Sequence, residues 1–202
     1  MSSIEAGNQA PQPRRRLSRD DRHRQLMDVA WRLVREEGTD ALTLGRLAER
    51  SGVTKPVVYD HFGTRAGLLL ALYREFDAHE NALIDTALAA SAPSLAGRAR
   101  VIASSYVDCV LAQGREIPGV IAALAGAPEL EKIKRDCDVA FMAKCRTALA
   151  PFAGAIAPAG LRAMLGAAEA LSCAAAAGEL TAAEAQDELV QIIVAMVARS
   201  AR

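Results

Sequence analysis

The sequence predicts an all-α protein, and three observations support this fold class. Hydrophobic residues make up 51% of the 202 positions but aromatic residues only 4%, so the core must be built mainly from alanine and aliphatic side chains. Hairpin signals of the Asn-Gly type are absent. Apolar residues also recur three and four positions apart along most of the chain, which is the spacing of an amphipathic helix.

The N-terminal 18 residues are predicted to form a disordered basic arm. Residues 1–13 are polar and contain two prolines, and a crowd of arginines follows from Arg14 to Arg24. Such an arm can lie in the minor groove of DNA, or it can be a solvated tail that raises solubility. The first helix is then expected from Asp20 to Glu37, with Ser18 as its N-cap and Gly38 at its end.

The next stretch, from Thr43 to Phe62, predicts two short helices joined by a glycine turn. Thr43 is a good N-cap for the first of them, and Gly52 can take the left-handed backbone of the turn. The second helix has Thr54 as its cap and Pro56 in its first turn. Because its outer residues are polar and basic, the pair is typical of a DNA-binding helix-turn-helix.

The chemistry of this stretch assigns each candidate residue a role on DNA. Positive charges neutralise phosphates, hydroxyl and imidazole groups donate hydrogen bonds to phosphate oxygens, and residues that open the second helix reach base edges. The candidates, in that order, are Lys55 and Arg65; Thr43, Tyr59 and His61; and Thr54, Pro56 and Val57. Tyr59 has an alternative structural role, with its ring packed on the core of the module. Charge supports the assignment modestly: residues 1–65 hold 12 Lys and Arg against 9 Asp and Glu, while the whole chain is neutral.

The remainder of the chain predicts a larger helical body, linked to the first module by a long helix from about Arg65 to Ala90. Further helices are expected at 94–113, 120–124, 129–150, 160–177 and 181–200. A ligand pocket in this body has five candidate lining residues, each of which can instead be an ordinary core residue: Tyr106, Cys109, Val110, Phe141 and Cys145. Phe76, His79 and Phe152 are weaker candidates. Few aromatic residues and few buried charges favour an apolar ligand.

The last two helices suggest a homodimer interface. The final helix has two apolar stripes, and the helix before it is dense in small residues that permit close helix approach. Two such hairpins from two chains would form a four-helix bundle, although a helix wrapped by its own domain has the same pattern. The interface residues expected on this basis are Leu161, Met164, Leu165, Ala168, Leu189, Ile193 and Met196.

Other function classes find little support. The three histidines form no metal-spaced cluster with carboxylates or cysteines, and no nucleophile motif or phosphate-binding glycine loop occurs, so we expect no enzyme activity, metal or cofactor. The four cysteines lack CxxC pairing and are expected to be reduced, with a thiol sensor as the minor alternative. No apolar run reaches the roughly 20 residues of a membrane helix, and no signal peptide is recognisable, which favours the cytoplasm.

One family shares these motifs. The run Gly52-Val53-Thr54-Lys55-Pro56, then Tyr59-Asp60-His61-Phe62, then Arg65 to Leu69, resembles the signature of the tetracycline-repressor (TetR) family. The likeness spans about Arg19 to Leu70 and extends beyond that only as length and helical pattern. Two residues depart from the family pattern: Asp60 would repel phosphate unless it points away, and Arg65 stands where lysine is usual.

The resemblance implies a DNA-binding domain over 19–64 and an effector-binding and dimerisation domain over 65–202. It also implies a transcriptional regulator, most often a repressor, that binds a palindromic operator as a homodimer and is released by a small molecule. The alternative is a small helical ligand-binding protein or enzyme whose helix-turn-helix is non-functional.

Overall fold

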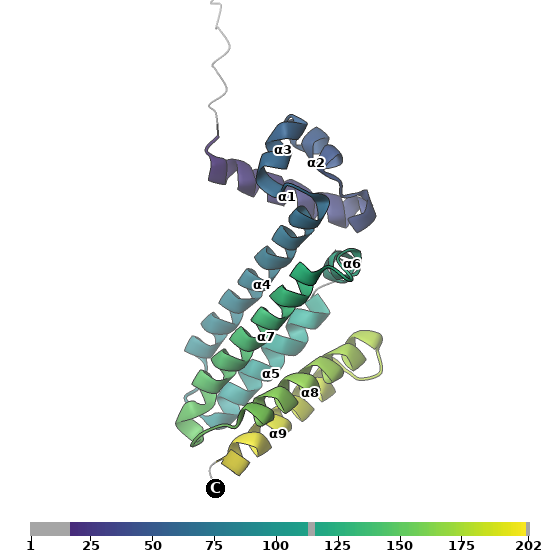
Figure 1. Ribbon diagram of the computed structural model, residues 1–202. Coiled ribbons are helices and arrows are strands. Elements are labelled where there is room, and N and C mark those ends of the chain that lie inside the picture. Colours follow the sequence, from purple (N-terminus) through teal and green to yellow (C-terminus); the bar gives the residue numbers. More distant parts are fainter. Residues whose placement is uncertain (1–16, 113–115, 201–202) are drawn as a thin grey trace, which may run out of the picture.

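The computed structural model describes residues 17–112 and 116–200, and its ordered elements are all helices (Figure 1). The all-α prediction is confirmed over these ranges. Of the expected N-terminal arm, residues 1–16 lie outside the described residues. The elements are α1 (Arg19–Glu37), the 3-10 turn η1 (Thr39–Ala41), α2 (Leu44–Ser51), α3 (Lys55–Phe62), α4 (Arg65–Ala90), α5 (Leu95–Ala112), α6 (Glu116–Ala123), α7 (Pro128–Leu149), the 3-10 turn η2 (Ala150–Phe152), α8 (Pro158–Ala177) and α9 (Ala182–Ser200).

Local sequence signals set the boundaries of the N-terminal helices. The side chain of Ser18 accepts a hydrogen bond from the backbone N–H of Asp21, and that of Thr43 accepts one from Arg46, so both predicted caps are confirmed. Gly52 ends α2 in the left-handed conformation, at φ 65°. Thr54 occupies the N-cap position of α3, but its side chain makes no capping hydrogen bond. Its hydroxyl is therefore left for another partner.

The core of the N-terminal module is continuous with part of the helical body. Buried side chains of α1, α2 and α3 form one cluster with the first turns of α4, as expected. Val120, Leu124 and Leu130, from α6, the turn after it and the start of α7, belong to the same cluster. The module therefore rests on two separate parts of the body, α4 and the α6–α7 corner. The division at residues 64 and 65 stays a prediction, because apolar packing crosses it.

The second core lies at the opposite end of the molecule, where α5, α8 and α9 pack on one another (Figure 1). This core corrects the predicted dimer interface. All seven expected interface side chains are at most 8% exposed within a single chain, and none is available to a partner: Leu161, Met164, Leu165, Ala168, Leu189, Ile193 and Met196. The apolar stripes were real, but they face the protein's own α5 and each other.

Among the described residues, no helix has the length and apolarity needed to cross a membrane.

Candidate nucleic-acid interface and ligand pocket

The outer face of α3 carries the residues that the sequence assigned to DNA. Thr43 at the start of α2, and Thr54, Lys55 and Pro56 at the start of α3, are all exposed, while Val57 is half-buried. Tyr59 is 53% exposed, so its ring is not packed in the module core and the structural alternative for it loses its basis. Helices α2 and α3 lie together at one end of the molecule, with α1 behind them (Figure 1).

The cations of this module divide into paired and unpaired groups. Arg46 bridges two carboxylates, with Nη2 3.0 Å from Glu37 Oε1 and Nη1 3.0 Å from Glu49 Oε2, and Arg50 pairs with a glutamate of α1. Within the part of the chain that the structure describes, Lys55 forms no ion pair. Its ammonium group is therefore not engaged by a carboxylate, and its contact with a phosphate stays a prediction.

Arg65 makes contacts that differ from its expected role. Its Nε donates to the carbonyl oxygen of Leu42 and its Nη2 to that of Thr39, both at 2.8 Å. The guanidinium thus ties the first turn of α4 to the segment that leads into α2. We propose that Arg65 positions the helix-turn-helix rather than neutralising a phosphate.

His61 lies at the edge of the α3 surface and is half-buried. Its ring centroid is 5.6 Å from that of His23 and 6.1 Å from that of Phe62. Burial, followed by the positive field of His23 and Arg19, lowers the pKa of His61 below its ordinary value. A neutral imidazole can donate one hydrogen bond to a phosphate oxygen but adds no charge. We therefore expect His61 to contribute less than Lys55 to any phosphate contact.

A cavity of about 170 Å³ lies in the body, between α4, α5, α7 and α8. Four of the five predicted lining residues do line it: Tyr106, Cys109, Val110 and Phe141. Tyr106 and Phe141 form a tilted ring pair with centroids 5.2 Å apart. Cys145 is a correction, because it is fully buried in the core beneath and does not reach the cavity. Phe76 lines the cavity as well, whereas His79 and Phe152 do not.

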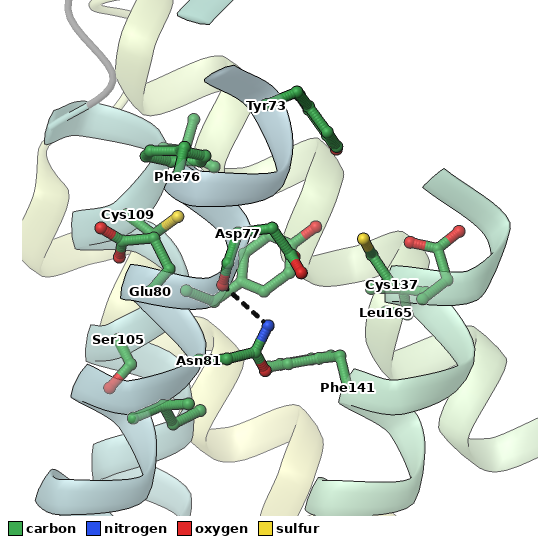
Figure 2. A pocket seen from close by; sticks show the side chains of 14 residues that line it. Tyr73, Phe76, Asp77, Glu80, Asn81, Ser105, Cys109, Cys137, Phe141 and Leu165 are labelled. Atoms are coloured by element: carbon green, nitrogen blue, oxygen red, sulfur yellow. Dashed lines mark hydrogen bonds between the residues drawn. The ribbon is translucent and has the colours of Figure 1, made fainter. Parts of the chain in front are cut away.

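Charged residues of the cavity were missed by the sequence reasoning. Figure 2 shows Asp77 and Asn81 of α4 on the side of Cys137 and Phe141 of α7, and Glu80 on the other side of α4, near Cys109. Asp138 also lines the cavity, so its wall carries three half-buried carboxylates, although no charged side chain among the described residues is fully buried, as expected. A signal existed: positions 73, 76, 77, 80, 81 and 84 follow helical spacing on one face of α4, and that face mixes aromatic and polar side chains.

The two cysteines of α7 are poor candidates for a redox sensor. Burial raises the pKa of the Cys145 thiol to about 12. Burial and a hydrogen bond with Asp77 raise the pKa of the Cys137 thiol to about 12 as well. Because the thiolate is the reactive form, both side chains are held in the unreactive state near neutral pH.

The fold and the exposed face of α3 together define a helix-turn-helix module joined to a helical body that contains a cavity. Residues 26–72 match the family model of the bacterial regulatory proteins, tetR family. The match runs from within α1 to the first turns of α4, and this part of the chain resembles the DNA-binding module of the TetR family.

Two curated relatives match part of the chain. The chain is 40% identical over 57 residues to the HTH-type transcriptional activator FasR of Mycolicibacterium smegmatis, and 33% identical over 82 residues to the HTH-type transcriptional regulator BetI of Rhizobium meliloti. These alignments cover 28% and 41% of the chain, and only 26% and 39% of the two relatives' own lengths.

Solved structures extend the likeness to nearly the whole fold. A putative TetR-family transcriptional regulator from Rhodococcus sp. superposes with a TM-score of 0.66 at 18% identity, covering 88% of this chain and 99% of that one. SCO4454, a TetR-family regulator from Streptomyces coelicolor, gives a TM-score of 0.66 at 19% identity, with 90% and 97% covered. At such identities the likeness establishes the fold alone.

Proposed function

We propose that this protein is a sequence-specific DNA-binding transcriptional regulator of the cytoplasm, which acts as a homodimer and responds to a small molecule held in the cavity of its body. The observation that supports the proposal is the exposed outer face of α3, whose Lys55 forms no ion pair among the described residues. This face belongs to a module that matches the family model of tetR-type regulatory proteins. Binding a palindrome requires two copies of α3 presented about one helical turn of DNA (~34 Å) apart, or a little more. The protein is a binding protein in this proposal, and whether it represses or activates depends on its operator.

The first test is selection from a randomised duplex pool, followed by measurement of the best binder over a range of salt concentrations. Enrichment of a palindrome, with a steep loss of affinity as salt rises, is the expected result. Weak binding with no enriched sequence would remove the proposed function and turn attention to the body alone.

Replacing Lys55 by alanine tests its proposed phosphate contact. Because a dimer carries two copies, we expect weaker binding to every duplex and a loss of about two from the slope of log affinity against log salt. Lys132→Ala is the matched control, since Lys132 is an exposed lysine of α7 paired with Asp136. Equal slopes for Lys55→Ala and the unmodified protein would show that Lys55 does not contact phosphate.

The proposed dimer needs a surface other than the predicted one. Along α8, exposed small residues recur at alternating intervals of four and three, which is the seam spacing of two packed helices: Ala159, Ala163, Gly166, Ala170, Cys173 and Ala177. Exposed Ala195 and Ala198 of the neighbouring α9 are also small. We propose that this face, on the outer side of the α8–α9 pair, meets its copy in a four-helix bundle.

A glutamate in the middle of that seam tests the dimer. Ala170→Glu places two like charges at the proposed contact while altering an exposed position of the single chain, so we expect a folded protein that sediments as a monomer. Ala143→Glu, at an exposed position of α7, is the control and should remain dimeric. A dimeric Ala170→Glu protein would place the interface elsewhere.

A further inference from the structure

The composition of the cavity wall indicates which molecules it can hold. Three of its lining residues are carboxylic acids, Asp77, Glu80 and Asp138, and four are aromatic. Among the fourteen described residues that line it, none is lysine, arginine or histidine. The wall therefore presents negative charge together with aromatic faces, and no positive charge of its own.

The three carboxylates of the cavity wall form no close ion pairs in the described part of the chain. Asp77 interacts with the Cys137 thiol, and all three are half-buried. Burial raises the pKa of Asp138, although Lys134 and Arg162 act in the opposite sense from outside the cavity. Lys144 is held nearby by Asp85 at 2.7 Å and does not line the cavity.

The four aromatic side chains of the cavity wall also favour the binding of a cation. Tyr73 and Phe76 of α4 line the cavity, and Tyr106 and Phe141 contribute a tilted ring pair to its wall. Burial raises the pKa of Tyr73 to about 12 and raises that of Tyr106 further, so both phenols are neutral and present their π-faces and hydroxyls. Aromatic faces attract organic cations, and they do so more strongly where water is excluded.

We infer that the cavity binds a compact organic cation, an aromatic or aliphatic amine of about the size of a substituted benzene. The volume of the cavity supports this size, because a cavity of roughly 150 Å³ accommodates benzene and this one measures about 170 Å³. A metal ion fits less well: within the described residues, no three His, Cys, Asp or Glu side chains gather closely enough to hold one. Binding of the cation does not depend on the proposed function; only an effect of that binding on DNA affinity rests on it.

Three ligands of nearly equal shape provide the test: 2-phenylethylamine, a cation; 2-phenylethanol, which is neutral; and phenylacetate, an anion. Isothermal titration calorimetry on the full chain at pH 7 should show the amine binding at least about ten-fold more tightly than the alcohol, since a desolvated cation–π contact with a paired charge supplies that difference. Phenylacetate should give no measurable heat. Equal binding of amine and alcohol, tighter binding of the anion, or binding of none of the three would overturn the inference.

Variants locate the charge that is responsible. Asp77→Asn combined with Glu80→Gln keeps the shape of the α4 wall and should bring the amine and the alcohol to within about two-fold of each other. Glu131→Gln, which removes an exposed carboxylate of α7 outside the cavity, should leave the preference intact. A double variant that still prefers the amine by ten-fold would contradict the assignment of the preference to the α4 carboxylates.

Calorimetry without DNA separates this inference from the proposed function. If the amine binds but the affinity for the selected duplex is the same with and without it, the cavity chemistry stands and the effector mechanism fails. If no duplex is selected at all, the ligand titration still shows whether the cavity prefers the amine.

Discussion

Replacing Gly67 by alanine is expected to displace α3 and abolish DNA binding. A Cβ atom at this position would lie 2.1 Å from the carbonyl oxygen of Phe62 and 3.3 Å from its carbonyl carbon. The obstacle is backbone, so no side-chain rotation relieves it. Phe62 ends α3, and the neighbouring Thr64 caps α4 by accepting a hydrogen bond from the Gly67 N–H at 3.0 Å. The added methyl group must therefore open the corner between α3 and α4.

The cost should reach the upper end of overpacking effects, about 3 kcal/mol. Trp31 is the sole tryptophan of the chain, packs against the core of the N-terminal module, and donates from Nε1 to Glu75, so its fluorescence reports unfolding of this module. In urea we expect a clearly lower midpoint for Gly67→Ala. Gly45→Ala is the control, because its Cβ would meet nothing closer than 3.6 Å and alanine is favoured inside a helix. An unchanged midpoint for Gly67→Ala would contradict the close approach.

Local chemistry explains why so much of the fold was predictable from the sequence. The start and end of α4, for example, are fixed by a threonine cap and by the end of the apolar pattern, both of which are readable without tertiary information. The predicted helix at 120–124 was less accurate, since α6 begins at Glu116 and includes Pro118 in its first turn. Proline is tolerated in the first turn of a helix, so the helix can begin before Pro118.

The direction of a helical face was harder to predict than the helix itself. Leu189, Ile193 and Met196 were correctly placed on one stripe, but the pattern alone does not say whether that stripe meets its own domain or a partner. The packing of α5 against α8 and α9 decides the question, and it is a long-range contact. Cys145 failed in the same way: it shares a face with Phe141, yet one turn further along α7 the cavity has ended and the core has begun.

Variants of Arg65 can distinguish a phosphate-neutralising role from a role in positioning the helix-turn-helix, because the two roles predict different unfolding midpoints. The guanidinium holds two carbonyl groups, those of Leu42 and Thr39. Hydrogen bonds to charged groups contribute about 1.5–3 kcal/mol each, so Arg65→Ala should lower the Trp31-monitored unfolding midpoint strongly. Arg65→Lys keeps the positive charge but loses the forked guanidinium group, and a lysine can replace only one of the two hydrogen bonds well. Its unfolding midpoint should therefore lie between that of the unmodified protein and that of Arg65→Ala.

A phosphate contact predicts the opposite pattern for the same variants. In that case Arg65→Lys would behave like the unmodified protein, Arg65→Ala would keep its unfolding midpoint, and its salt slope for duplex binding would fall by about two per dimer. Lys55→Ala supplies the reference for that behaviour, since Lys55 is exposed and unpaired among the described residues and should lose salt slope without losing stability. The positioning role requires that DNA affinity follow the unfolding midpoint across the Arg65 variants, because α2 reaches its place on DNA only when the segment before it is held.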